Sequence, residues 1–184
     1  MGIGIFLAVV AAFVFYVISL YNGLVSKKTL AEEGFSGIDV QLKRRADLIP
    51  NLIETVKGYM QHEKSTLENI TALRARAQGA TSVDDRLVAE AGITKALAGI
   101  MMVAENYPQL QASSSFVNLQ GQLSEIENQL QMARRYYNGA ARDLNVMVDQ
   151  FPGNLIAARF GFTKKPFFEL DNEADRQVQK VSFN

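Results

Sequence analysis

The chain has 184 residues, with 19 basic and 19 acidic side chains, one histidine, no cysteine and no tryptophan. This length is enough for a membrane anchor and one domain of ordinary size. The balanced charge gives no basic field, so nucleic acid is not an expected partner. The lack of cysteine excludes disulfides, thiolate metal sites and a cysteine nucleophile, and the single histidine argues against most hydrolytic and metal chemistry.

The first element is an apolar segment from Ile3 to Leu20 that carries no charged residue. As a helix it spans about 27 Å, close to the ~30 Å hydrocarbon core of a bilayer. A cleaved signal peptide is the alternative interpretation. It fits less well, because no basic residue precedes the run, the run is longer than a signal-peptide core, and no small-residue cleavage site follows. We therefore expect residues 1–20 to be an uncleaved transmembrane anchor.

The residues around this anchor predict its orientation. Only Met1 and Gly2 precede the apolar run, whereas Lys27 and Lys28 follow it closely. Because positively charged flanks tend to stay in the cytoplasm, we expect the N-terminus outside and the following domain inside.

Within the anchor, Gly4, Ala8 and Ala12 place small side chains along one side. Such a series lets two helix backbones approach closely in lipid, and it therefore predicts self-association. The alternative is that glycine and alanine are simply common in membrane helices.

After the anchor, apolar residues recur at steps of three and four, which is typical of helices. Prolines and glycines break this pattern and predict helices at about 21–49, 50–78, 84–106 and 116–151, with Ser82 as the predicted N-cap of the third. Short connections favour antiparallel neighbours. We expect an all-α fold, with an up-and-down four-helix bundle of long helices over residues 21–151 and a C-terminal tail over 152–184.

A long apolar stripe and a proline are the main features of this bundle. The last helix has an unbroken apolar stripe from Phe116 to Phe151 over about five heptads, which is typical of coiled-coil-like packing. Pro50 follows the stripe of the first helix, and the residue before a proline resists helical geometry. Pro50 either turns the chain back or only kinks one long helix, and the predicted bundle takes the first alternative.

Three ordered motifs mark the helical region: Ile38–Leu52 reads IDVQLKRRADLIPNL, Glu105–Leu110 reads ENYPQL, and Ala133–Asn138 reads ARRYYN. Together with their order, these motifs closely resemble the LemA family of bacterial membrane proteins. The resemblance extends from about Tyr21 to Phe168. It implies a membrane anchor followed by a helical bundle, here in the bacterial cytoplasmic membrane, and it implies no particular activity.

Polar and amphipathic residues within these helices are the interaction candidates: Arg44, Arg45, Asp47 and Asn51 near Pro50, and Glu127, Arg134, Tyr137, Asn138 and Asn145 along the last helix. The main interpretation is an interhelical network in which arginine forks match carboxylates. A partner-docking surface is the alternative, and catalysis is a weaker one. The pair His62-Glu63 lacks partners at metal-ligand spacing, so neither a metal nor a cofactor is expected.

Aromatic and basic residues mix in the tail and at the end of the anchor. The membrane-interface candidates are Tyr21, Lys27, Lys28, Phe160, Phe162, Phe167 and Phe168, with Arg159, Lys164 and Lys165 among them. Such a segment can pack onto its own bundle, bind a partner or lie in a membrane interface. If Pro50 turns the chain back, the fourth helix brings Phe151 and the segment Leu155–Phe168 to the headgroups. If Pro50 only kinks the helix, the tail is expected far from the bilayer. The polar stretch 171–180 is expected to be a weakly structured end.

These observations favour a non-enzymatic, membrane-anchored helical-bundle protein that self-associates and acts as a structural or scaffold protein. The alternative is a subunit or regulator of a membrane enzyme such as a quality-control protease. The expected partners are the lipid bilayer and a second copy of the chain, with other membrane proteins as further candidates.

Overall fold

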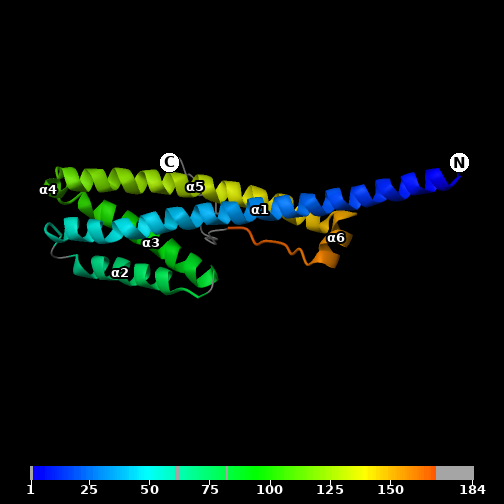
Figure 1. Cartoon of the computed structure of the whole chain (residues 1–184). Helices are drawn as coiled ribbons and strands as arrows, with labels where there is room; N and C mark the ends of the chain where they lie inside the picture. Colours follow the sequence, from blue (N-terminus) through cyan, green and yellow to red (C-terminus); the bar gives the residue numbers. More distant parts are fainter. Residues whose placement is uncertain (1, 61–62, 82, 169–184) are drawn as a thin grey trace, which may run out of the picture. The chain divides into compact units, whose positions relative to one another are not determined.

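The computed structural model describes residues 2–60, 63–81 and 83–168, and throughout these ranges every regular element is a helix. The elements are α1 (Gly2–Lys57), α2 (Lys64–Gly79), α3 (Val83–Ala104), α4 (Pro108–Gln111), α5 (Ser114–Asp149) and α6 (Gly153–Phe160), as Figure 1 shows. The expected all-α class is confirmed for this part of the chain. Ser82, His62 and the stretch 171–180, which the sequence analysis singled out, lie outside the described residues.

The first helix is longer than expected, because α1 continues through Pro50 to Lys57. The hairpin predicted at Pro50 is therefore wrong, and the chain leaves the helix at Gly58 instead. A proline inside a helix removes one backbone hydrogen bond and costs about 3 kcal/mol. Here Pro50 is exposed, while Leu52 and Val56 beyond it are fully buried, so packing outweighs that cost.

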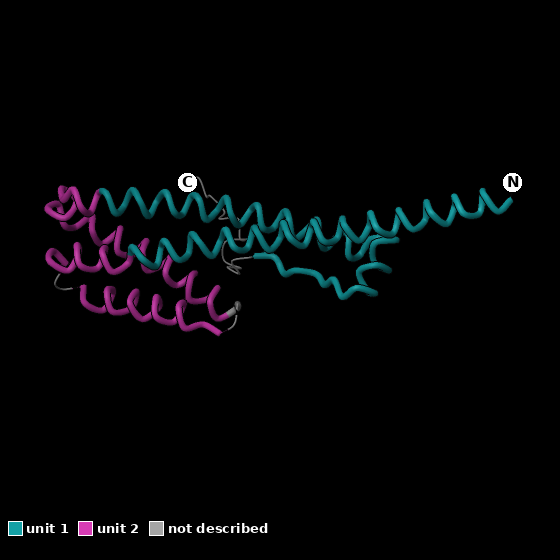
Figure 2. The backbone as a smooth tube through the Cα atoms, in the orientation of Figure 1, with its two compact units in different colours: residues 1–48, 118–168 teal, residues 49–117, 169–184 magenta. Residues whose placement is uncertain are grey.

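The helices group into two compact units, which Figure 2 colours separately. Unit 1 contains residues 2–48 and 118–168 of the described chain, and unit 2 contains 49–117 with the gaps given above. The sequence-based division into anchor, bundle and tail depends on where the bilayer lies, which these packing units do not test. That division therefore stays a prediction.

In unit 1, α1 and α5 run antiparallel. Lys27 pairs with Asp143, and Arg45 pairs with Glu127 farther along the helices. Gly34 is buried between these pairs, and a Cβ atom there would come 3.0 Å from the Cα atom of Tyr137. The missing side chain thus lets the two helices approach closely.

A small apolar core joins α6 to this pair of helices. Leu24 and Ala31 from α1 meet Leu144 from α5 and Ala157 from α6. The turn between α5 and α6 is tight, because a Cβ atom at buried Gly153 would collide with the backbone oxygen of Met147. These contacts fold α6 back against the helices that precede it.

In unit 2, α2 and α3 form an antiparallel pair. Arg76 near the end of α2 lies 3.9 Å from Asp85 near the start of α3. Farther from the turn, a Cβ atom at Gly92 would approach the Cδ2 atom of Leu73 to 2.8 Å, which marks another close helix contact. Ile70 and Ile93 are buried in the same unit.

The apolar stripes predicted from the sequence are largely the buried faces of the helices. In α1 and α5 the buried stripe residues are Ala31, Ile38, Leu42, Ala46, Ile49, Phe116, Leu119, Leu123, Ile126, Leu130, Tyr137 and Leu144. Phe151 is the exception, because α5 ends at Asp149 and leaves this side chain 74% exposed in the following turn.

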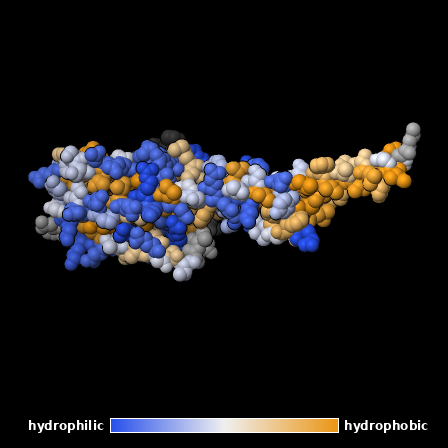
Figure 3. All heavy atoms as spheres, in the orientation of Figure 1, coloured by the Kyte–Doolittle hydropathy of each residue, from blue (hydrophilic) through white to orange (hydrophobic). Residues whose placement is uncertain are grey.

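Two described helices are long and apolar enough to cross a membrane, by length and composition alone: α1 and the stretch Asp85–Ala104 of α3. They differ in burial. None of the apolar window of α1 is buried, and Figure 3 shows its hydrophobic side chains gathered along the N-terminal part of the helix. In α3, 28% of the window is buried, and the helix packs against α2. Of these two described helices, the N-terminal part of α1 has the exposed apolar surface that lipid contact requires.

Candidate functional site

The interhelical network predicted from the sequence begins at Arg45, which is 1% exposed on α1. Its Nη1 atom donates a hydrogen bond of 3.1 Å to Oε2 of Glu127 on α5. A buried arginine is tolerated only when its charge is paired and its N–H groups find acceptors. This pair therefore links α1 and α5 in a defined register.

The neighbouring candidates Arg44 and Asp47 lie at the surface instead. Arg44 donates hydrogen bonds to Gln129 on α5 (3.1 Å) and to Gln41 on its own helix (3.4 Å). Arg44 and Asp47 also line an open groove of about 460 Å³ together with Glu125 and the apolar Ile126. Asn51 is exposed within unit 2. The structure thus separates one buried pair from a set of accessible polar groups.

The other candidates on α5 hold the end of the described chain, residues 163–168, which we call the strap. The strap follows Gly161, whose φ of 73° ends α6 in the left-handed conformation that favours glycine. Asn145 donates from Nδ2 to the oxygen of Lys165 and accepts at Oδ1 from the nitrogen of Lys165, each over 2.8 Å. Asn138 does the same with Phe168, over 3.2 and 2.8 Å.

Tyr137, next to Asn138 on α5, donates its hydroxyl hydrogen over 2.7 Å to the oxygen of Pro166, which lies between Lys165 and Phe168. Its ring packs edge-on against Phe35 of α1, and burial raises the pKa of the phenol. The guanidinium of Arg134 lies 4.9 Å from the ring centre of Phe168, a cation–π distance. The motif ARRYYN thus supplies three side chains that hold the strap.

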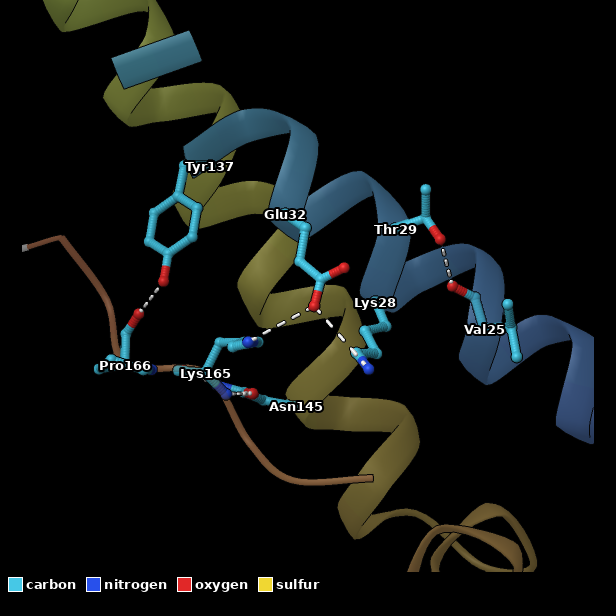
Figure 4. A network of polar contacts seen from close by, with 8 residues as sticks. All are labelled: Val25, Lys28, Thr29, Glu32, Tyr137, Asn145, Lys165 and Pro166. Carbon is cyan, nitrogen blue, oxygen red and sulfur yellow. Dashed lines mark hydrogen bonds and ion pairs between the residues drawn. The ribbon is translucent and has the colours of Figure 1, made fainter. Parts of the chain in front are cut away.

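Ion pairs reinforce the strap at its first residues. Lys164 lies 3.0 Å from Asp149, and Lys165 lies 3.8 Å from Glu32 of α1. Glu32 also lies 3.9 Å from Lys28 one turn earlier. Figure 4 shows Glu32 between the two lysines, with Asn145 and Tyr137 reaching the strap from α5.

A second group of candidates gathers where α1 leaves its apolar segment. The ring of Tyr21 lies 4.9 Å from the ring of Phe160 and 5.7 Å from the ring of Phe162, centre to centre. Nearby, Tyr16 and Leu20 line a groove of about 420 Å³ with residues 150–153. The turn between α5 and α6 therefore reaches the last two turns of the apolar segment.

Several large apolar side chains stay exposed at this end of unit 1. Phe151, Leu155 and Phe160 are 74%, 60% and 55% exposed, and Arg159 beside them is exposed too. Phe162, in contrast, is half-buried against the core of Leu24 and Ala157. The sequence placed Phe151 and Leu155 at the headgroups only if Pro50 turned the chain back. The structure keeps α1 helical through Pro50 and still puts Phe151 beside Tyr16 and Leu20.

The strap moves Phe167 and Phe168 away from this end. Phe168 is only 7% exposed and bonds to Asn138, which lies seven residues before Asn145 on α5. The expectation that Phe168 enters a membrane interface is therefore wrong in this structure, and it packs within unit 1. Phe167, half-exposed beside it, belongs to the same part of the strap. The reason is that α5 binds the strap along its length.

Lys27 lies on α1 next to this end of unit 1. Its Nζ atom donates a hydrogen bond of 2.9 Å to Oδ2 of Asp143 on α5. That hydrogen bond, and then the charge of Lys27, lower the pKa of Asp143 below its usual value, with a smaller contribution from Arg142. Lys27 is thus partly engaged within the protein, while Lys28 is exposed.

Among the described residues, no group of three or more His, Asp or Glu side chains could hold a metal ion. Sequence reasoning did not single out as site residues the strap's acidic partners Glu32 and Asp149, or Asp143, which pairs with Lys27. They lie among many other exposed charges, and only the fold shows which of them face a lysine.

An exposed apolar N-terminal helix, continuous with a helix that packs through a polar network, defines a helical protein with a candidate membrane anchor. The chain belongs to the LemA family, whose model matches residues 34–183. This match confirms the resemblance seen in the sequence motifs.

Similarity extends to individual relatives. The chain is 24% identical to a magnetosome protein MamQ of Paramagnetospirillum magneticum over 195 residues, covering 92% of this chain and 72% of the relative. It is 22% identical to the MamQ protein of Magnetospirillum gryphiswaldense, covering 91% and 71%. Protein LemA of Metamycoplasma hominis is 24% identical, covering 89% and 75%.

Proposed function

We propose that this protein is a non-enzymatic, single-pass membrane protein that self-associates and acts as a structural or scaffold protein at the bacterial cytoplasmic membrane. The observation that carries the proposal is the continuity of α1. Its exposed apolar segment continues without a break into the stretch that packs against α5. A rigid helix of this kind couples an anchor directly to a folded surface.

We also propose the finer architecture expected from the sequence, an up-and-down bundle of α1, α2, α3 and α5. The antiparallel pairing of α1 with α5 in unit 1 and of α2 with α3 in unit 2 supports it. The turn after Lys57 replaces the turn expected at Pro50. Spin labels on α2 and α5 of the full chain should give one narrow distance distribution, and a broad one would contradict the bundle.

The proposed topology places the N-terminus outside and the helical units in the cytoplasm, because Lys28 is exposed just after the apolar segment. The absence of native cysteine makes a clean test possible. Single cysteines at the exposed positions Ser26 and Ser36 should resist a membrane-impermeant thiol reagent in intact cells and react after lysis. Labelling of both in intact cells would reverse the orientation.

Self-association is proposed to use the small residues of the anchor. Gly4, Ala8 and Ala12 are exposed, and no side chain lies within 4 Å of the Cβ position at Gly4. Replacing all three with leucine should weaken the assembly seen by native mass measurement in mild detergent. Val10→Leu and Val17→Leu, on the opposite side of the helix, are the control. A wild-type protein that is monomeric over a broad concentration range would contradict this proposal.

The alternative function, a subunit or regulator of a membrane enzyme, is favoured by one observation. The charged side chains of Arg44 and Asp47 line an accessible groove rather than a buried network. A pull-down of the full-length protein in mild detergent separates the two functions. Recovery of a membrane enzyme that is lost with Arg44→Ala and Asp47→Ala, while self-association persists, would favour the alternative.

A further inference from the structure

The strap is bound as a separate peptide would be bound. Four hydrogen bonds join the side-chain amides of Asn138 and Asn145 to backbone atoms of Lys165 and Phe168, two donated by the asparagines and two by the strap. Each asparagine pairs with the N–H and the C=O of one strap residue. Asparagine side chains that bind the backbone in this way recognise an extended conformation. The strap's own side chains remain available for other contacts that give sequence specificity.

The spacing of the two asparagines matches an extended chain. Seven residues of α-helix rise about 10.5 Å, and the three steps from Lys165 to Phe168 span about 10 Å when extended. Pro166 lies between them. It holds the preceding Lys165 in the extended region, and its own missing N–H leaves no donor unpaired. Its oxygen accepts the hydroxyl hydrogen of Tyr137.

Side-chain contacts then distinguish this peptide from others. Glu32 and Asp149 each lie within 4.0 Å of a strap lysine, and Phe168 is buried beneath the guanidinium of Arg134. The α1–α5 surface thus prefers two basic residues, a proline and an aromatic residue in this order. The strap, which reads TKKPFF, has that chemistry.

We propose that α1 and α5 form a binding site for an extended peptide, which holds the strap of its own chain here and accepts the strap of a second copy in exchange. An exchanged strap makes the same contacts as its own, so exchange between copies costs little once they are held together. Gly161, with its left-handed φ, is the point at which the strap would diverge from α6. This inference deepens the proposed self-association and rests on it for the second copy.

The test uses the full-length protein in mild detergent and a fluorescent peptide of residues 162–168. In the strap variant, Lys165→Pro and Phe168→Pro remove the two N–H donors and free the site. The groove variant carries Asn138→Ala and Asn145→Ala in addition to the strap substitutions. Alanine is a strong helix former, so α5 should stay helical. Helix content by circular dichroism should be the same in both.

We expect the peptide to bind the strap variant and to bind wild-type protein more weakly, because the wild-type site is filled. Binding should fall by about tenfold or more in the groove variant, since four hydrogen bonds are lost. A peptide that is N-methylated at residues 165 and 168 keeps every side chain but lacks both donors, and it should lose affinity similarly. This control needs no further change in the protein.

Equal binding of the normal and N-methylated peptides would overturn the site, as would equal binding by the strap and groove variants. A scrambled peptide that binds equally well would overturn the strap as its ligand. Exchange itself is tested by co-purifying two differently tagged copies. The first copy carries only Asn138→Ala and Asn145→Ala and keeps its strap, with a photo-reactive residue at position 167. The second copy is the strap variant, whose site is free. Co-purification without a cross-link between copies would reject exchange while leaving self-association intact. Failure to co-purify would reject the proposed function as well.

Discussion

The guanidinium of Arg45 on α1 lies 3.1 Å from the carboxylate of Glu127 on α5, with Arg45 buried and the Glu127 side chain 32% exposed. Removing one partner of such a pair leaves a buried charge without full compensation. We expect Glu127→Ala to lower the free energy of unfolding by about 2 kcal/mol, less than for a wholly buried pair because water still reaches the site.

Two further variants complete this measurement by chemical denaturation. Combining Glu127→Ala with Arg45→Met should restore most of the loss, since no buried charge remains. Glu68→Gln breaks an exposed pair with Lys64 and should change stability by less than about 0.5 kcal/mol. A double variant as unstable as Glu127→Ala alone would show that the loss does not come from the uncompensated charge of Arg45.

Gly34 tests the close approach of α1 and α5. Alanine in a helix is favoured over glycine by about 1 kcal/mol, so Gly37→Ala, with open space around its Cβ position, should stabilise the protein. Gly34→Ala should instead destabilise it, because the added methyl group meets the backbone of Tyr137. Thermal denaturation of the two variants compares them directly. Equal shifts would mean that the helices separate at no cost.

The pair of Lys27 and Asp143 predicts an acid-dependent contribution to stability. The pKa of Asp143 is lowered in the folded protein, so its contribution is present above the pKa of the unfolded state and is lost as the pH falls through the folded value. Asp143→Asn should therefore be less stable than wild type at neutral pH. The difference should vanish in acid and shrink in high salt. A difference independent of pH would assign the effect to packing.

Tyr137 predicts the opposite dependence at alkaline pH. Burial raises its pKa, so the neutral phenol stabilises the fold below the unfolded pKa of about 10, and this contribution is lost as the pH rises through the folded value. Tyr137→Phe should cost about 1 kcal/mol at neutral pH by removing the hydrogen bond to Pro166. Tyr136→Phe, at the exposed neighbouring residue, should cost little. Ultraviolet absorbance of phenolate formation follows the titration.

The exposed apolar residues beside Tyr21 predict a membrane contact. An environment-sensitive dye on Leu155→Cys of the full-length protein should shift to the blue on reconstitution into bilayers, more so with anionic lipid near Arg159. The same dye on Met132→Cys, an exposed apolar position farther along α5, is the control. If the dye at position 155 shifts no more than the dye at position 132, α6 does not lie in the membrane interface.

The sequence by itself determined the helical class, the buried stripes and the family. Residues such as Ile38 on α1 and Leu130 on α5 recur at helical spacing and are buried. Such periodicity is local, because it depends only on the geometry of one helix. The motifs that carry the family resemblance are likewise short runs of residues.

Only the tertiary structure decided how these helices are used. Pro50 predicted a turn from local geometry, but the burial of Leu52 and Val56 keeps α1 helical through it. The sequence predicted Phe168 to be exposed at a membrane interface. In the structure Asn138, thirty residues earlier in the chain, binds the backbone of Phe168. Contacts of this kind join residues that no spacing in the sequence relates, since their proximity arises from packing of α1, α5 and the strap.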